Sequence, residues 1–246
     1  MVEMKRVLAE LMGTAWLLYF GIGAHAGDKL SAAFAWGAAY MTVYWLYGSD
    51  SNPAVTIAHI LNGDMEAVQG IIDIVAQAAG AVLGCTLLLL TVHDTAWEDF
   101  ASATNKVNHD PVGFHNEHAF IGEALVTFFI VTAIFEIKSN ANCSPAAVGL
   151  AYFLATWFLF PIDGCSVNPV RSFAPAVVGS LHGSHDDSVS DTDRFWTAHW
   201  IYWIGPITGA IISAVWRKLT GDSSADQADA EAPTAADDVE GELGKV

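Results

Sequence analysis

The fold is decided by the stretch Asp163-Gly-Cys-Ser-Val-Asn-Pro-Val-Arg-Ser-Phe173, which lies between two strongly apolar segments. Only eight residues separate Arg171 from the preceding apolar run, residues 145–162. A charged side chain so close to membrane-type sequence is costly to bury, so it normally faces a cavity or a partner. The same asparagine–proline pair occurs in similar surroundings at Ser51-Asn-Pro-Ala-Val-Thr56. Two such insertions in one chain indicate a pore built from two halves.

Apolar residues make up 53% of the 246 residues and charged residues only 15%, which is outside the usual composition of soluble proteins. The apolar residues are concentrated in six runs, each about long enough to cross a hydrocarbon core of ~30 Å. The sequence therefore predicts an all-α protein that crosses the cell membrane several times and contacts the lipid bilayer. The predicted transmembrane helices are residues 7–26, 30–47, 71–92, 119–137, 145–162 and 196–216.

Negative charge is carried mainly by three polar segments outside these runs. Residues 93–117, 180–197 and 220–246 hold 17 of the 27 acidic residues, and the net charge is −17. Carboxylate-rich, lysine-poor surfaces are typical of adaptation to high salt, where screening weakens their mutual repulsion. We therefore expect a salt-adapted microbe as the source, and the acidic surface argues against nucleic acid as a partner. Residues 220–246 are predicted to form a disordered, solvated tail.

Basic residues near the ends of the runs favour cytoplasmic N- and C-termini. Five of them flank one set of ends and three flank the other, and the richer side is normally cytoplasmic. The five are Lys5, Arg6, Lys138, Arg217 and Lys218, and the three are Lys29, Lys106 and Arg194.

The sequence predicts no metal site and no cofactor. Cys85, Cys143 and Cys165 have neither metal-type spacing nor the pattern of a disulfide framework. The histidines of residues 93–118 are irregularly spaced, which is more typical of a solvated loop than of a metal site.

An internal repeat defines the architecture. Ala9-Glu-Leu-Met-Gly-Thr14 is echoed by Gly122-Glu-Ala-Leu-Val-Thr127, and the glutamates precede Asn52 and Asn168 by 42 and 45 residues. Each half contains three spans, so the second half must enter the membrane upside down. The prediction is an inverted repeat within a channel domain at residues 1–219, with repeat 1 at about residues 5–92 and repeat 2 at about 118–219.

Residues 52–61 and 168–179 are too short to cross the membrane and are predicted to be re-entrant half-helices. Asparagine suits the N-cap of a helix, and proline suits the first helical position, where its missing N–H is not needed. Irregular backbone at membrane depth is tolerated only where it is buried in protein or lines a cavity. The predicted fold is therefore six transmembrane helices plus two re-entrant half-helices.

Two half-helices that meet near the membrane centre would point their positive ends at one another, each with about half an elementary charge. Such a field repels cations and protons from a water file. Asn52 and Asn168 would donate hydrogen bonds to a passing oxygen, and Arg171 would add a fixed positive charge. This constellation predicts a passive channel for water that excludes protons and ions.

The two motifs and the two glutamate-containing repeat starts resemble the aquaporin (major intrinsic protein) family over about residues 5–219. The resemblance implies a right-handed helical bundle, one pore per subunit and a homotetramer. It also implies that Glu10 and Glu123 are buried acceptors for the backbone N–H groups of the re-entrant loops. The other residues that stand at the positions of the family's two asparagine–proline motifs are Pro53, Ala54, Pro169 and Val170.

Several positions resemble the water-selective branch of that family, and these are Ser172, Ala176, Tyr202 and Trp203. The resemblance also implies a narrow selectivity filter. Counting back from the asparagines without gaps, its members are Thr156, Cys165, Arg171 and Ala32, although Phe34 or Trp36 replaces Ala32 if the second span shifts.

The chain departs from the water-selective pattern at four positions. Thr156 stands where histidine is typical and Ala32 where phenylalanine is typical, so the filter is expected to be wider. Val170 adds bulk beside the asparagines, and Asp50 replaces a common histidine. The alternative function is therefore a facilitator for glycerol or other small neutral solutes such as ammonia and urea.

Two other classes of protein receive less support. An intramembrane enzyme would require a motif such as Gly-x-Ser-x-Gly or His-Glu-x-x-His, and the sequence has neither. A secondary transporter would share the inverted repeat but would also require coupling carboxylates inside the bundle. The sequence thus predicts a channel and not an enzyme.

Overall fold

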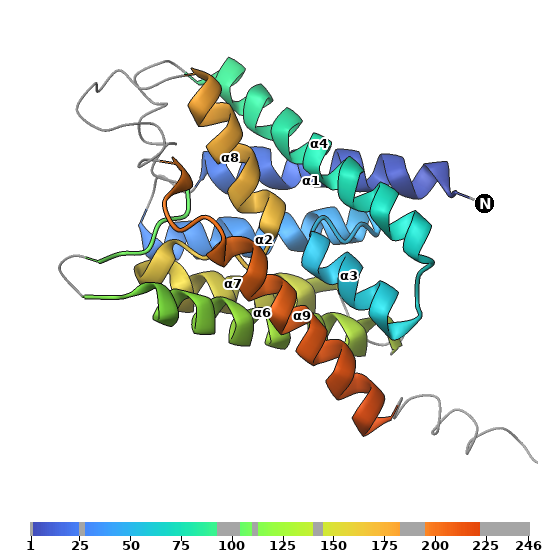
Figure 1. Cartoon of the computed structure of the whole chain (residues 1–246). Coiled ribbons are helices and arrows are strands. Elements are labelled where there is room, and N and C mark those ends of the chain that lie inside the picture. Colours follow the sequence, from blue (N-terminus) through green and yellow to red (C-terminus); the bar gives the residue numbers. More distant parts are fainter. Residues whose placement is uncertain are drawn as a thin grey trace, which may run out of the picture.

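The computed structural model describes residues 2–24, 28–92, 104–109, 113–139, 145–182 and 195–221. Within these ranges the chain forms eight α-helices and no β-strand, as the sequence predicts (Figure 1). The predicted tail at residues 220–246 lies almost wholly outside the described residues, as do Cys143 and Arg194.

Six helices are long and two are short. The long helices are α1 (Met4–Gly23), α2 (Lys29–Tyr47), α4 (Ala67–Thr91), α6 (Asn116–Ser139), α7 (Pro145–Asp163) and α9 (Ile201–Thr220). The short ones, α3 (Pro53–Asn62) and α8 (Pro169–His182), begin at the two asparagine–proline pairs. The predicted six spans and two half-helices are therefore present in this order.

The long helices pack in pairs that relate the two halves of the chain. α1 packs along α4, α6 packs along α9, and α2 packs along α7 at the junction between the halves (Figure 1). The short helix α3 packs on α9, and α8 packs on α4, so each half-helix is covered by the last helix of the other half. This exchange confirms the inverted-repeat architecture.

Small residues permit the close approach of the paired helices. A Cβ atom at Gly84 of α4 would clash with the Ala15 carbonyl oxygen of α1. At the equivalent crossing, a Cβ at Gly209 of α9 would clash with the Ala124 carbonyl oxygen of α6. The same packing solution therefore occurs in both halves.

By length and composition alone, three of the described helices are apolar enough to cross a membrane, namely α4, α6 and α7. The helices α1, α2 and α9 are 19 or 20 residues long but are richer in glycine, tyrosine, tryptophan or charged residues, which reduces their mean hydropathy. Large apolar side chains nevertheless cover the outside of the bundle. Phe34, Trp45 and Leu90 are 69%, 75% and 76% exposed, as expected for a surface that faces lipid.

The start of α1 and the end of α9 lie at the same end of the bundle (Figure 1). The two asparagine–proline pairs lie inside the bundle, where their residues are fully buried. The candidate site is therefore built around the interior ends of α3 and α8.

Candidate functional site

Two buried glutamates hold the backbone that leads into the half-helices. The carboxylate of Glu10 on α1 accepts hydrogen bonds from the backbone N–H groups of Asp50 and Ser51, both at 2.8 Å. The carboxylate of Glu123 on α6 accepts from the N–H groups of Ser166 and Val167, both at 2.6 Å. Each glutamate thus satisfies two N–H groups that would otherwise be buried without a partner.

The residue before each asparagine has a left-handed backbone. Ser51 and Val167 both have φ of 48°. This conformation is unfavourable for a residue other than glycine, and especially for a β-branched one such as Val167. It persists because the surrounding hydrogen bonds over-determine it, and strain of this kind is concentrated at functional sites.

Each asparagine caps its own half-helix. Asn52 Oδ1 accepts from Ala54 N at 2.9 Å, and Asn168 Oδ1 accepts from Val170 N at 3.1 Å. The prolines at positions 53 and 169 occupy the first helical position, as expected. With the oxygen used in this way, the side-chain nitrogen of each asparagine points away from its own helix.

The two side-chain nitrogens connect the halves reciprocally. Asn52 Nδ2 donates to the Val167 carbonyl oxygen at 2.8 Å, and Asn168 Nδ2 donates to the Ser51 carbonyl oxygen at 2.8 Å. The left-handed residues therefore present their carbonyls to the asparagine of the opposite half. The positive ends of α3 and α8 meet at this point inside the bundle.

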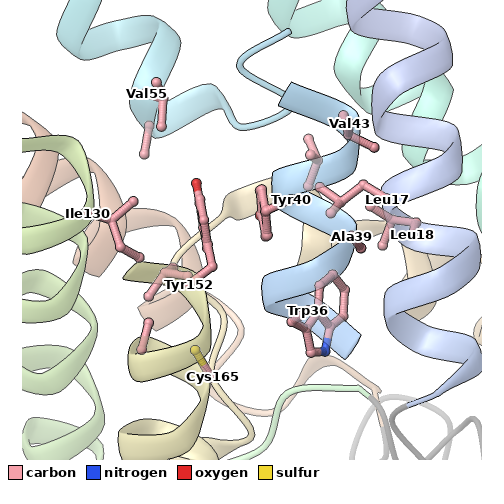
Figure 2. Close-up of a cluster of buried hydrophobic side chains, with 14 of the residues drawn as sticks. Leu17, Leu18, Trp36, Ala39, Tyr40, Val43, Val55, Ile130, Tyr152 and Cys165 are labelled. Carbon is pink, nitrogen blue, oxygen red and sulfur yellow. The ribbon is translucent and has the colours of Figure 1, made fainter. Parts of the chain in front are cut away.

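The second hydrogen of each amide goes to a tyrosine. Asn168 Nδ2 donates to the Tyr40 hydroxyl at 2.8 Å, and Asn52 Nδ2 donates to the Tyr152 hydroxyl at 3.2 Å. Figure 2 shows Tyr40 and Tyr152 extending from α2 and α7 toward the space between them. Their rings stack with centroids 3.3 Å apart and an angle of 3° between the planes.

Sequence reasoning did not identify the tyrosines, although a signal was present. The pattern Gly-x-Ala-Tyr occurs at residues 37–40 and again at 149–152. Gly37 and Gly149 also face one another, because a Cβ on either would come within 2.7 Å of the other's carbonyl oxygen. The tyrosines therefore extend from the α2–α7 contact three residues after these closely packed glycines.

Arg171 is fully buried two residues into α8 and is oriented by two neighbours. Its guanidinium donates to Asn105 Oδ1 at 2.7 Å, and its Cζ lies 4.8 Å from the ring centroid of Trp36. The side chain of Asn105 also accepts from the Ser172 hydroxyl at 2.6 Å. Asn105 comes from the segment predicted to be a solvated loop, so that expectation is wrong for this residue, which is buried.

The span-2 candidates for the filter are separated by their positions. Trp36 contacts Arg171, whereas Phe34 is exposed on the outer surface. Ala32 is buried one helical turn before Trp36. The structure thus brings Trp36, and not the expected Ala32, against the arginine. Thr156 and Cys165 are both buried, and their side chains interact with each other.

Asp50 is surrounded by basic side chains at the end of the bundle where the chain begins. Its carboxylate accepts from Arg6 at 2.9 Å and lies 3.4 Å from Lys138 Nζ and 3.6 Å from His59 Nε2. Arg6 in turn donates to Asp73 at 2.6 Å. Sequence reasoning counted Arg6 and Lys138 only as indicators of orientation, but both are partly exposed partners of the buried Asp50 carboxylate.

The remaining sequence-predicted positions are packed near Arg171 or on the neighbouring α9. Ser172 donates to Asn105 and lies 2.6 Å from the Ser166 hydroxyl. Val170, Ala176 and Tyr202 are fully buried, and Trp203 packs edge-on against Phe173. In the described part of the chain, no group of three or more potential ligand side chains is positioned for a metal ion.

Comparison with protein families decides the identity. The model of the major intrinsic proteins matches residues 1–216, which is most of the chain. The chain belongs to the major intrinsic protein family. Members of this family are membrane channels and not enzymes, as predicted from the motifs.

Relatives of this major intrinsic protein occur in a mammal, a plant and an amoeba. It is 29% identical to "Aquaporin-5" of Ovis aries over 227 residues, which is 86% of this chain and 79% of the relative. It is 31% identical to "Probable aquaporin TIP3-2" of Arabidopsis thaliana over 219 residues, 80% of this chain and 72% of the relative. It is 28% identical to "Aquaporin A" of Dictyostelium discoideum over 231 residues, 85% and 76% of the two chains.

The fold of this family member is similar to that of the aquaglyceroporin from Plasmodium falciparum. The TM-score is 0.72, with 18% sequence identity and coverage of 87% of this chain and 94% of the other. The likeness supports the bundle of six helices and two half-helices described above.

Proposed function

We propose that this major intrinsic protein is a passive water channel that excludes protons and ions. One observation carries the proposal: the N-terminal ends of α3 and α8 meet inside the bundle, with Asn52 and Asn168 at the junction. The aligned helix dipoles place positive potential there, which opposes the passage of a cation or an excess proton.

Arg171 supports ion exclusion at a second level of the pore. The guanidinium is buried, and the Asn105 side chain holds it in place. A buried guanidinium is a permanent positive charge with several hydrogen-bond donors, so it repels cations and binds water oxygens. We assign the filter to Arg171, Trp36, Thr156 and Cys165, with Ala32 one turn away.

Trp36 favours water over larger solutes. The expectation of a wider filter depended on Ala32 replacing an aromatic residue, but the ring of Trp36 lies directly against Arg171. An aromatic side chain beside the arginine occupies the space that a polyol would need. The water-type residues Ser172, Ala176, Tyr202 and Trp203 support the same assignment.

The second candidate is conduction of small neutral solutes, including glycerol, ammonia and urea. It is favoured by Thr156, whose small side chain stands at a filter position near Cys165. This candidate requires a filter that is wider than a single water molecule.

The proposal also covers assembly and orientation. The exposed apolar residues Phe34, Trp45 and Leu46 on the outer face of α2 suit contact with lipid or with a neighbouring subunit in a homotetramer. The shared end of α1 and α9, with Lys5, Arg217 and Lys218, is assigned to the cytoplasm.

The test is a measurement of two permeabilities in the same reconstituted vesicles. Under an osmotic gradient of impermeant solute, stopped-flow light scattering should show faster shrinkage than in protein-free vesicles. In a glycerol or urea gradient, re-swelling should be no faster than in protein-free vesicles. Unchanged water permeability would overturn the proposal, and fast re-swelling would establish the second candidate.

A further inference from the structure

The stacked tyrosines occupy the place where a permeating molecule would meet the asparagines. Tyr40 and Tyr152 are 4% and 1% exposed, and their hydroxyls hydrogen-bond to the amides of Asn168 and Asn52. The two rings also stack on each other, with centroids 3.3 Å apart. Figure 2 shows the two side chains next to each other between α2 and α7, and their bonds to the amides place them at the level of the half-helix junction.

The N–H donors of both asparagine side chains are already occupied. A primary amide has two N–H donors. In each asparagine, one donor goes to a backbone carbonyl of the opposite half and the other goes to a tyrosine hydroxyl. A water molecule can reach an asparagine donor only by displacing a tyrosine hydroxyl or the backbone carbonyl of the opposite half.

The space beside the pair is also small. A cavity of about 10 Å³ lies next to Tyr40 and Tyr152 and is lined further by Val55, Ile134 and Asp50. Both volumes refer to the space open to the centre of a water molecule, and roughly 10–15 Å³ of it is needed to hold one water. At most about one water fits on this side of the stacked rings.

We propose that Tyr40 and Tyr152 form the constriction that limits conduction and sets solute size in this channel. The pair, and not the filter around Arg171, is the narrowest point, and conduction requires the rings to separate and the hydroxyls to release the amides. This inference rests on the proposed channel function and identifies the residues that determine its rate and its exclusion of larger solutes.

A purely structural role for the tyrosines makes a different prediction. Rings that serve only to pack α2 against α7 would leave conduction unchanged when their hydroxyls are removed. A constriction held by hydrogen bonds to the amides responds to loss of the hydroxyl alone. Phenylalanine and valine variants therefore separate the two roles.

The experiment compares wild-type vesicles with Tyr40→Phe, Tyr152→Phe and Tyr40→Val/Tyr152→Val vesicles. Loss of one hydroxyl–amide hydrogen bond should raise water permeability roughly 2- to 10-fold per channel. The double valine variant should conduct water faster still and should also admit glycerol. Because the tyrosines occupy equivalent positions, the two phenylalanine variants should have similar effects.

Tyr47→Val is the matched control. Tyr47 lies on the same helix but lines an outer apolar groove between α1 and α2, so its replacement should leave both permeabilities unchanged. Size-exclusion profiles and thermal unfolding in detergent establish that each variant is folded. The phenylalanine variants, which keep the rings, provide the test if the double valine variant does not fold.

The outcomes separate this inference from the proposed function. If wild-type conducts water and the folded tyrosine variants match it in rate and in glycerol exclusion, the inference is overturned and the water channel stands. If wild-type is silent and the variants conduct, the constriction is supported and water conduction by the native chain is overturned. If none of the folded proteins conducts, both fall.

Discussion

The two halves of the channel are near copies of one another at the centre and differ toward the two ends. At the centre, each glutamate holds two backbone N–H groups, and each asparagine donates to a carbonyl of the opposite half at 2.8 Å. Three residues beyond the asparagines, the second half carries Arg171 and the first carries Val55.

This difference separates two kinds of requirement. The central geometry is the same in both halves because two opposed half-helices need the same support. In the proposed channel the ends differ because the ion barrier places a fixed charge at one level only. Near one end, Arg171 contacts Trp36 and Asn105. Near the other end, the Asp50 carboxylate lies close to the basic side chains of Arg6, Lys138 and His59.

The largest expected effect tests the equivalence of the central supports. Glu10→Ala and Glu123→Ala each leave two backbone N–H groups buried without an acceptor, and each such group costs about 1–3 kcal/mol. Both variants should unfold at much lower temperature in detergent, by comparable amounts. Thermal unfolding followed by light scattering or tryptophan fluorescence measures this loss.

Glutamine at either position keeps one acceptor oxygen and serves as the control. Glu10→Gln and Glu123→Gln should lose about half as much stability as the alanine variants. Severe destabilisation by one alanine substitution and near-normal stability of the other would break the equivalence of the two halves.

Arg171→Val gives the second half the residue that the first half has at this position, Val55. We expect it to reduce stability less than the glutamate substitutions do, but to weaken the exclusion of ions clearly. A unit charge acting over ~4 Å at the effective dielectric of a protein surface is worth about 4 kcal/mol. The variant should therefore leak protons or alkali cations at least roughly tenfold faster. A pH-sensitive dye trapped in vesicles with an imposed gradient measures the leak.

Lys218→Val removes one positive charge from the exposed end of α9 and should leave the leak at the wild-type level. Asn105→Ala keeps the Arg171 charge but removes its 2.7 Å partner, so its leak should lie between those of wild-type and Arg171→Val. If Arg171→Val leaked protons and cations no faster than wild-type, Arg171 would not contribute to the exclusion of ions.

The smallest expected effect concerns the outer end of α3. Asp64 accepts hydrogen bonds from Asn62 and His59, whereas the position in α8 equivalent to His59 is Pro175. Partial burial acts to raise the pKa of Asp64, but the hydrogen bonds from His59 and Asn62 outweigh it and hold the pKa below the usual range.

Because the pKa of Asp64 is lowered in the folded chain, its contribution is full above the ordinary carboxyl pKa of about 3.9. The contribution is lost as the pH falls through the lowered value. Asp64→Asn should thus be less stable than wild-type near neutral pH, by less than about 1 kcal/mol because the side chain is 40% exposed. Thermal unfolding across pH should show the two proteins converging in acid; a constant difference would contradict the assignment.

Much of the centre could be predicted from the sequence because its requirements are local. Asparagine followed by proline starts a helix, and the repeated glutamate spacing identifies the residues that hold each start. The motif Gly-x-Ala-Tyr, which occurs once in each half, is also a short-range pattern. Aligning the two halves could have identified Tyr40 and Tyr152 from it.

The surroundings of Arg171 could not be predicted in the same way. Counting back to Ala32 assumes a regular path between α2 and α3, but Gly48 and Ser51 both take left-handed backbone there. Asn105 reaches Arg171 across 66 residues, from a polar segment whose composition resembles an ordinary loop. Contacts of this kind depend on tertiary packing and leave no periodic signal in the chain.

The reciprocal bonds between Asn52 and Val167, and between Asn168 and Ser51, also constrain how the protein is made. Asn52 and its carbonyl partner are 115 residues apart, and Asn168 and its partner are 117 apart. During synthesis, the first re-entrant segment is complete long before its hydrogen-bond acceptor leaves the ribosome. Neither half can complete the hydrogen bonds of its own asparagine. The Asn52 side chain therefore lacks its carbonyl partner until the second half is inserted beside the first.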